Sequence, residues 1–146
     1  MLYQVAPNLY FGDQQACSAN GAIVHACKSP CFTQVSHGFR NPLWIESYNH
    51  LYLNIIDSEK PLFVMGLFTK FLAFTEEHIK EGPVVIHCNQ GQSRAPSLAL
   101  VYMAKRLKVL TDASYVAAAR EFMQNAPYYP SLGIQLWLRK NWDYIE

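Results

Sequence analysis

The sequence has little charge for its length. Only 16% of its 146 residues are Asp, Glu, Lys or Arg, where about a quarter is usual for globular domains. Twelve basic residues balance eleven acidic ones to give a formal net charge of +1. A chain without surplus positive charge lacks the broad electrostatic footprint that attracts nucleic acids or anionic membranes. We therefore expect neither as a partner, and any bound anion must be held locally.

Long hydrophobic runs, repeats and linkers are also missing. No stretch of 18 uncharged apolar residues occurs, so no membrane span is predicted. Residues 1–8 have neither the basic start nor the apolar core of a secretory signal. With 51% apolar residues, a chain of this length buries about two-thirds of its unfolded surface. We expect one soluble, unprocessed domain over residues 1–146, acting as a monomer.

Cysteine is scarce and unevenly spread. Three of the four cysteines, Cys17, Cys27 and Cys31, fall within fifteen residues, and Cys88 is far from them. This spacing does not predict a pair of structural disulfides, so a reducing, cytoplasmic setting is expected. One alternative stays open: if Cys27 ends a central strand near Cys88, the two thiols would form a protective disulfide on oxidation.

A zinc site built from the same region is not predicted. The candidate ligands are Cys17, His25, Cys27, Cys31 and His37. Cys27 and Cys31 are four residues apart with no second close pair, which fits poorly with known zinc spacings. Strand alternation places His25 and Cys27 on one sheet face in any case. Ordinary core and loop roles are favoured, and no metal or cofactor is expected.

Predicted strands and helices alternate along the chain. The strands cover residues 9–11, 22–27, 51–56 and 83–87, and the helices cover residues 61–81, 93–107, 111–123 and 132–142. In the first helix Leu67, Phe71, Phe74 and His78 recur at helical spacing. Thr111-Asp112 is the expected cap of the third helix. This order predicts a three-layer α/β domain whose central, mostly parallel but mixed sheet is flanked by helices.

The most informative stretch is residues 84–94. An apolar run, typical of a buried parallel strand, changes abruptly to Cys-Asn-Gln-Gly-Gln-Ser-Arg at the start of a helix. Such a loop directs backbone N–H groups and the helix dipole at one point, where phosphate binds. We call residues 88–94 the P-loop. Its predicted phosphate-binding residues are Asn89, Gln90, Gly91, Gln92, Ser93 and Arg94.

Within this P-loop, Cys88 is the predicted nucleophile. Helix N-termini and neighbouring cations favour the thiolate over the thiol. Gly91 permits the backbone turn, and Arg94, six residues after Cys88, can fork two N–H bonds onto phosphoryl oxygens. An inert buried cysteine would need neither residue behind it. The loop therefore predicts both binding of a phosphate group and attack on it.

Residues 87–94 resemble the His-Cys-x-x-Gly-x-x-Arg signature of the cysteine-dependent protein phosphatases, in their compact dual-specificity branch. Residues 5–12 are similar to that family's opening strand, and residues 125–136 to its Pro-rich loop and last helix. Residues 27–45 match least well. The resemblance implies a single catalytic domain with a dual-specificity-phosphatase-like fold, and His87 is expected to orient the P-loop by hydrogen bonding.

The general acid is expected to be Asp57. Only four aspartates occur, and Asp57 follows a predicted strand at the sheet edge where α/β proteins bind ligands. Its distance of 31 residues from Cys88 and its Ile-Asp-Ser context resemble the family's general-acid loop. A turn or capping role for Asp57 stays open, with Glu59 as the reserve acid. Asp112 is interpreted as a cap, and Asp143 lies near a terminus that is expected to fray.

The resemblance implies two chemical steps and no metal. Cys88 attacks phosphorus to give a phosphocysteine intermediate while Asp57 protonates the leaving oxygen, and water then hydrolyses the intermediate with Asp57 as base. One position departs from the family, where Ser or Thr usually follows the arginine: here it is Ala95. We expect slower breakdown of the intermediate, unless Ser93 or Ser97 supplies the missing hydroxyl.

The expected substrates are phosphoproteins. Asn89, Gln90 and Gln92 carry no charge, whereas phosphatases of polyphosphorylated inositol lipids tend to place lysines here, so a singly phosphorylated target is favoured. A short chain predicts a shallow cleft that accepts phosphotyrosine and also phosphoserine or phosphothreonine.

Tyr128, Tyr129 and Arg40 are candidate substrate contacts.

Two rival interpretations of the function stay open. One is a pseudophosphatase that binds phosphorylated partners, and the other, much less favoured, is a rhodanese-like sulfurtransferase, which would not need Asp57.

Overall fold

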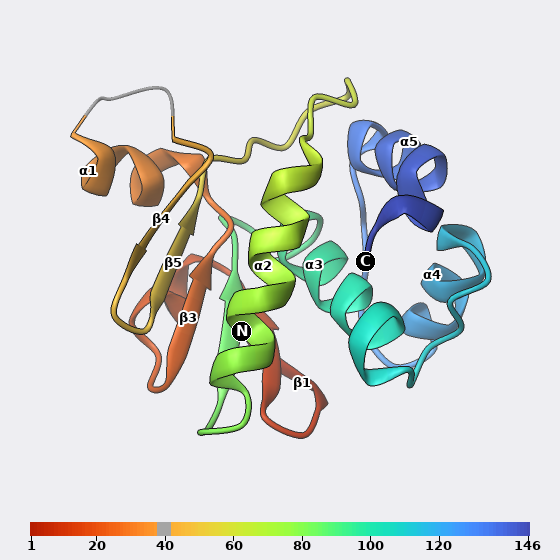
Figure 1. Ribbon diagram of the computed structural model, residues 1–146, viewed down its shortest axis with the longest axis horizontal. Helices are drawn as coiled ribbons and strands as arrows, with labels where there is room; N and C mark the ends of the chain where they lie inside the picture. Colours follow the sequence, from red (N-terminus) through yellow and green to blue (C-terminus); the bar gives the residue numbers. More distant parts are fainter. Residues whose placement is uncertain (38–41) are drawn as a thin grey trace.

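A computed structural model describes residues 1–37 and 42–146 and is organised around a six-stranded sheet (Figure 1). The strands are β1 (Leu2–Ala6), β2 (Leu9–Gly12), β3 (Ala22–His25), β4 (Trp44–Ser47), β5 (His50–Leu53) and β6 (Val84–His87). Their order is β1-β2-β6-β3-β5-β4. The four inner strands are parallel, and β1 and β4 pair antiparallel at the two edges. The prediction of a mostly parallel, mixed sheet is confirmed.

Strand β6 lies between two parallel neighbours and has no exposed residue. A strand covered on both faces reads as a continuous apolar run, which is what residues 84–86 show. The register places Gly12 of β2 and His25 of β3 level with His87 of β6. Because these strands are parallel, their carboxyl ends meet at one edge of the sheet, and Cys88 follows directly at that edge.

Four longer helices lie on one side of the sheet. Helices α2 (Met65–His78) and α3 (Arg94–Tyr102) pack against its strands, and α4 (Tyr115–Met123) and α5 (Leu132–Asn141) pack beyond α3. In Figure 1, α2 crosses in front of the strands, and α4 and α5 lie to the right of α3, away from the sheet. The predicted apolar face of α2 is buried through Leu67, Phe71 and Phe74. None of the described helices is both long and apolar enough to span a membrane.

The other face of the sheet is covered by shorter turns: η1 (Gln14–Ser18), η2 (Lys28–Phe32) and α1 (Thr33–Ser36). Along β3 and β6, Val24 and Ile86 belong to the apolar core beneath the helices. Since successive side chains of a strand alternate between faces, His25 and His87 project toward the short turns. The two faces therefore differ, one apolar under helices and the other rich in histidine.

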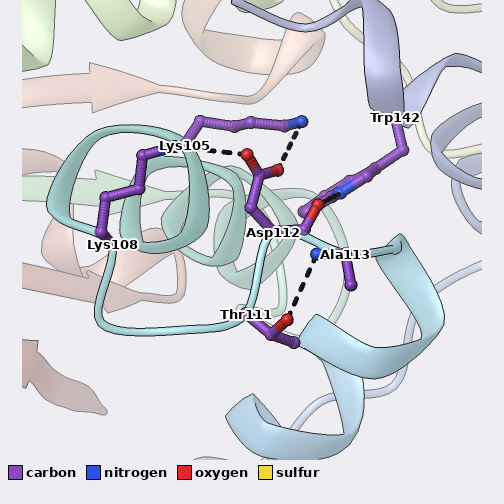
Figure 2. A network of polar contacts seen from close by, with 6 residues as sticks. All are labelled: Lys105, Lys108, Thr111, Asp112, Ala113 and Trp142. Carbon is purple, nitrogen blue, oxygen red and sulfur yellow. Dashed lines mark hydrogen bonds and ion pairs between the residues drawn. The ribbon is translucent and has the colours of Figure 1, made fainter.

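The predicted cap of α4 is wrong. Ser114, in extended backbone, accepts a hydrogen bond from the Ala117 N–H and begins the helix, which starts at Tyr115. Asp112 instead turns away and pairs with Lys105, whose ammonium lies 2.7 Å from its carboxylate. Figure 2 shows this network, in which the Thr111 hydroxyl accepts only from the nearby Ala113 N–H. The buried lysine therefore competes for the carboxylate that the sequence pattern assigned to capping.

The short edge strands β1 and β4 were not predicted either. Their side chains are mostly exposed or half-buried, so they lack the apolar runs that mark the inner strands. The predicted strands at residues 22–27 and 51–56 end earlier, at His25 and Leu53. The polar backbone that follows each of them forms part of the site at the sheet edge.

Candidate active site

The P-loop is held by backbone hydrogen bonds from several segments. Cys88 N–H donates to the Gly12 carbonyl at 3.3 Å, and the Asn89 carbonyl accepts from Gln14 N–H at 3.2 Å. On the other side, the Gln92 carbonyl accepts from Tyr129 N–H at 2.9 Å. The end of β2, the start of η1 and the loop before α5 therefore hold the P-loop through its backbone.

Gly91 is required by the shape of this loop. Its φ of +69° lies in the left-handed region, and a Cβ there would lie 2.9 Å from the Gly12 carbonyl carbon. Only glycine adopts this backbone without strain while another backbone passes so close. The predicted role of Gly91 in the turn therefore agrees with the geometry.

Cys88 lies at the bottom of the loop, with 2% of its surface exposed. Its Sγ accepts a hydrogen bond from the Ala95 N–H at 3.4 Å, in the first turn of α3. Backbone N–H groups at a helix start favour negative charge. The sulfur therefore lies at the start of α3, in contact with one of its backbone N–H groups.

Arg94 is buried beside Cys88 with neutral partners only. Its Nη1 donates to the Ile55 carbonyl at 3.1 Å, and its Nη2 donates to Asn89 Oδ1 at 2.6 Å. Over residues 1–37 and 42–146, no carboxylate forms an ion pair with Arg94, and its Nε has no hydrogen-bond partner. A buried cation without a counter-charge favours binding of an anion.

Asp57 lies in the loop between β5 and α2 and is tied to the P-loop through Ser93. Its Oδ1 accepts a hydrogen bond from Ser93 Oγ at 3.0 Å, and Ser93 Oγ accepts from Ser131 N–H at 2.9 Å. The predicted acid and the predicted nucleophile line the same cavity. Glu59, the reserve acid, does not line it.

This cavity has a volume of about 250 Å³ and is lined by Asp57, Cys88, Asn89, Gln90, Gln92, Ser93, Arg94 and Tyr129. A second cavity of about 320 Å³ lies against the same loop and is lined by Met1, Tyr3, Gly12, Asp13, Gln90, Gly91, Gln92, Pro127 and Tyr129. Three residues line both, namely Gln90, Gln92 and Tyr129. The two cavities are therefore neighbours along the P-loop.

The candidate substrate contacts Tyr128 and Tyr129 differ in burial. Tyr129 is 68% exposed and lines both cavities, whereas Tyr128 is 3% exposed. The Tyr128 hydroxyl lies 2.6 Å from Ser97 Oγ and 2.8 Å from the Tyr115 hydroxyl, and burial raises the pKa of Tyr128 well above its ordinary value. Tyr128 therefore packs in the core and lines neither cavity, so the geometry favours Tyr129 and not Tyr128 as a substrate contact. Arg40 lies outside the described residues.

The hydroxyls proposed to replace the missing one beside Cys88 are engaged elsewhere. Ser97 Oγ pairs with Tyr128, and Ser93 Oγ bonds Asp57 and the Ser131 amide. Ala95 is fully buried and offers Sγ only its backbone N–H. Neither Ser93 nor Ser97 therefore supplies the hydroxyl that the family usually has at the position of Ala95.

His87 is fully buried beneath the loop, and its Nε2 lies 2.7 Å from His25 Nδ1. The His25 Nε2 in turn lies 3.0 Å from His50 Nδ1. Burial lowers the pKa of His87 to about 4 and that of His25 to about 3, so both rings are neutral at physiological pH. A neutral His87 does not favour proton transfer. Its Nε2 contacts His25 and Cys31 and not the P-loop, so its expected role in orienting that loop stays a prediction. The row of contacts from His87 through His25 to His50 was not predicted. The only feature that points to it is the pairing of His25 with His87 in the register of β3 against β6.

Comparisons with solved structures place this fold among the phosphatases. The human DUSP28 structure gives a TM-score of 0.69 at 17% identity, covering 98% of this chain and 93% of that one. A DUSP15 structure gives 0.71 at 17% identity, covering 97% and 86%. The human tyrosine phosphatase-like serine/threonine/tyrosine-interacting protein gives 0.71 at 16% identity, covering 98% and 96%. The chain has the fold of the dual-specificity phosphatases.

Sequence comparison points to the same branch. Two relatives from Dictyostelium discoideum, each named a probable dual specificity protein phosphatase, are 30% identical over 110 residues and 29% over 100 residues. These matches cover 73% and 68% of this chain, but the chain spans only 26% and 45% of those relatives. No family model matches the chain. In sequence and in fold the resemblance to compact dual-specificity phosphatases is confirmed.

Proposed function

We propose that the chain is a cysteine-dependent phosphoprotein phosphatase, with residues 1–146 as a single catalytic domain. It hydrolyses phosphotyrosine and also phosphoserine or phosphothreonine monoesters. The observation that carries the proposal is one cavity that joins Cys88, the uncompensated Arg94 and Asp57. A nucleophile, an anion-binding cation and an acid at one point are what phosphate-ester cleavage needs.

In the first step Cys88 Sγ attacks phosphorus, forming an S–P bond as the ester P–O bond breaks. Arg94, whose Nε is free, and the P-loop amides stabilise the charge on the phosphoryl oxygens. Asp57 gives its proton to the leaving oxygen. Since Ser93 Oγ donates to Asp57 Oδ1, the transferred proton is carried by Oδ2.

In the second step water attacks the phosphocysteine and breaks the S–P bond. Asp57 now accepts the proton of that water, which restores its acid form. The sulfur leaves as a thiolate, stabilised by the Ala95 N–H that contacts Sγ at 3.4 Å. Catalysis is supplied mostly by positioning and electrostatics on a pre-built loop.

The cleft supports singly phosphorylated protein side chains as substrates. Asn89, Gln90 and Gln92 line it without charge, and the exposed ring of Tyr129 lies at its border with the second cavity. Additional phosphates would find no further cation among these lining residues. Four free thiols, Cys88 included, support action in a reducing cytoplasm, and we propose a monomer with no nucleic-acid or membrane partner.

A pseudophosphatase that binds phosphorylated partners is the second candidate. Ala95 favours it, because within residues 1–37 and 42–146 no side-chain hydroxyl contacts the Cys88 sulfur to assist its departure. A fold shared with phosphatases and with a phosphatase-like interacting protein does not separate the two functions.

Hydrolysis of p-nitrophenyl phosphate and of phosphopeptides, in EDTA with reductant, tests the proposal. We expect turnover by the wild type, loss of at least about 10³-fold in Cys88→Ser, and unchanged turnover in Cys17→Ser as matched control. Hydrolysis by Cys88→Ser at the wild-type rate would overturn the mechanism. A wild type that is inactive but binds vanadate through Cys88 would establish the pseudophosphatase.

A further inference from the structure

A second cluster of reactive side chains lies beneath the P-loop, on the face of the sheet opposite the long helices. His25 ends β3, His87 ends β6, and Cys31 lies in the turn η2. The parallel register pairs His25 with His87, so both rings project from the same face at the same level. One ligand atom from each of the three residues lies within 4.8 Å of the other two.

These distances are close to those of a tetrahedral zinc site. His25 Nδ1 lies 2.7 Å from His87 Nε2, and Cys31 Sγ lies 3.9 Å from the same Nε2. Zinc bonds of about 2.05 Å to nitrogen and about 2.3 Å to sulfur give ligand edges of about 3.3 Å (N–N) and about 3.6 Å (N–S). An ion would therefore separate the two imidazoles by about 0.6 Å and draw the sulfur in by about 0.3 Å.

One of the two rings, His25, also has the far-side partner that a metal ligand needs. His25 Nε2 lies 3.0 Å from His50 Nδ1, so a proton on Nε2 leaves Nδ1 free to bind a metal. The corresponding far atom, His87 Nδ1, is buried and has no hydrogen-bond partner within the described residues. It can take the proton that the two imidazoles otherwise share.

We propose that His25, Cys31 and His87 form a binding site for a zinc-type divalent cation, with water in the fourth position. Two neutral imidazoles and a thiolate are the ligand set that such cations prefer. Binding displaces the thiol proton of Cys31 and moves the shared imidazole proton to His87 Nδ1. The ion would join β3, β6 and η2 directly behind the nucleophile, and the proposed phosphatase chemistry does not use it.

The test uses a Cys88→Ser background, so that the P-loop thiolate cannot be the ligand. Metal-free protein is titrated with Co²⁺ under reductant and followed by absorption. We expect one Co²⁺ per chain with a sulfur-to-cobalt charge-transfer band in the near ultraviolet, and its displacement by Zn²⁺. Zn²⁺ should also raise the thermal midpoint of unfolding, because an ion that binds only the folded chain stabilises it.

Paired variants in the same background identify the ligands. Adding Cys31→Ser should remove the charge-transfer band and the Zn²⁺ effect on unfolding, while adding Cys17→Ser should preserve both. Adding His50→Ala should keep the band and weaken the affinity about 10–100-fold, as loss of an outer partner does. Circular dichroism without metal shows whether each variant is folded.

Two results would overturn the proposal: a Cys88→Ser protein that gives no thiolate band, or a band that survives Cys31→Ser. The first would assign the histidines to an ordinary hydrogen-bonded core. Because no assay here reads phosphatase activity, failure of the metal site and failure of the proposed function are separate outcomes.

Discussion

A buried cation lies near each end of the helical stretch that runs from residue 94 to residue 107, and the two have different surroundings. Arg94 and Lys105 are each 9% exposed. Arg94, beside the P-loop, has the Ile55 carbonyl and Asn89 Oδ1 as partners. Lys105 faces Asp112 at 2.7 Å, and its ammonium lies 4.5 Å from the centre of the Trp142 ring (Figure 2).

This difference separates a binding group from a structural one. A buried charge is costly unless something compensates it. Asp112 provides that compensation for Lys105 inside the chain, so the charge at this end of the helix is neutralised by an internal ion pair. We call this the closed end, and the end at Arg94 the open end. At the other end no carboxylate among the described residues compensates Arg94, and its unpartnered Nε is where we propose that an anion binds. The cost of burying a cation is therefore offset by a carboxylate of the chain at Lys105, and we propose that a bound anion offsets it at Arg94.

For this comparison of the two cations, the largest expected effect is that of Arg94→Lys. Lysine keeps the charge but cannot fork two N–H bonds onto a phosphoryl group or hold Ile55 and Asn89 together. We expect kcat/KM for a phosphotyrosine peptide to fall about 10³-fold, with weaker vanadate binding. The matched change Lys105→Arg should leave kcat/KM within about threefold. If Arg94→Lys stays within tenfold of the wild type, charge alone suffices and the comparison fails.

The next effect is that of Asp57→Asn, which keeps an acceptor for Ser93 but removes the acid. We expect kcat to fall about 10²-fold on phenyl phosphate. The loss should be smaller on p-nitrophenyl phosphate, whose leaving group needs less protonation. Rates on both substrates are measured together. Equal, small losses would assign Asp57 to the turn or capping role that the sequence left open.

The sequence predicts the part of the site that is contiguous. Residues 87–94 carry the strand end, the loop and the helix start in one segment, so the P-loop follows from local pattern. Asp57 is predicted because parallel strands end at a common sheet edge, and β5 and β6 both do so. The position of the P-loop is thus set by interactions among a few neighbouring residues, and that of Asp57 by the topology of the sheet.

The parts that were missed depend on tertiary packing. Tyr128 is next to Tyr129 in a Pro-rich loop, and nothing in the pattern shows that one ring enters the core and the other faces the cleft. The pairing of Lys105 with Asp112 overrides a local capping preference in the same way. The His25 and His87 contact requires the register of β3 against β6, which a single sequence does not specify.

At the closed end of the helix, Asp112→Asn should cost stability and leave catalysis intact. Burial alone would raise the pKa of Asp112, but hydrogen bonds from Lys105 and Lys108 outweigh it and lower that pKa below 3.8. Because this carboxylate is partly exposed, we expect a loss of only about 1–2 kcal/mol in the free energy of unfolding at pH 7. Denaturant titrations of both proteins measure it.

The sign of the pH dependence follows from the lowered pKa. Asp112 contributes its stability above the unfolded pKa of about 3.9, and this contribution is lost as pH falls through the folded pKa. The difference between wild type and Asp112→Asn should therefore be constant from pH 7 to about pH 5 and shrink below pH 4. A difference that grows toward acid pH would contradict the ion pair with Lys105.

The smallest expected effect is that of Ala95→Ser, at the open end of the helix. Ala95 N–H already contacts Cys88 Sγ at 3.4 Å, so a serine hydroxyl adds one further hydrogen bond to the departing sulfur. A net gain of about 0.5–1.5 kcal/mol should raise steady-state kcat about threefold to tenfold. The value of kcat/KM should not change, because it reports only steps up to formation of the intermediate.

Stopped-flow measurements separate the two steps. We expect a burst of p-nitrophenol from the wild type, since breakdown of the phosphocysteine limits turnover, and a smaller burst from Ala95→Ser. A burst that is absent from the wild type but present in Ala95→Ser would show that the hydroxyl speeds formation of the intermediate instead. In that case Ala95 slows the attack of Cys88 on phosphorus. The missing hydroxyl would then matter for formation of the phosphocysteine and not for its hydrolysis.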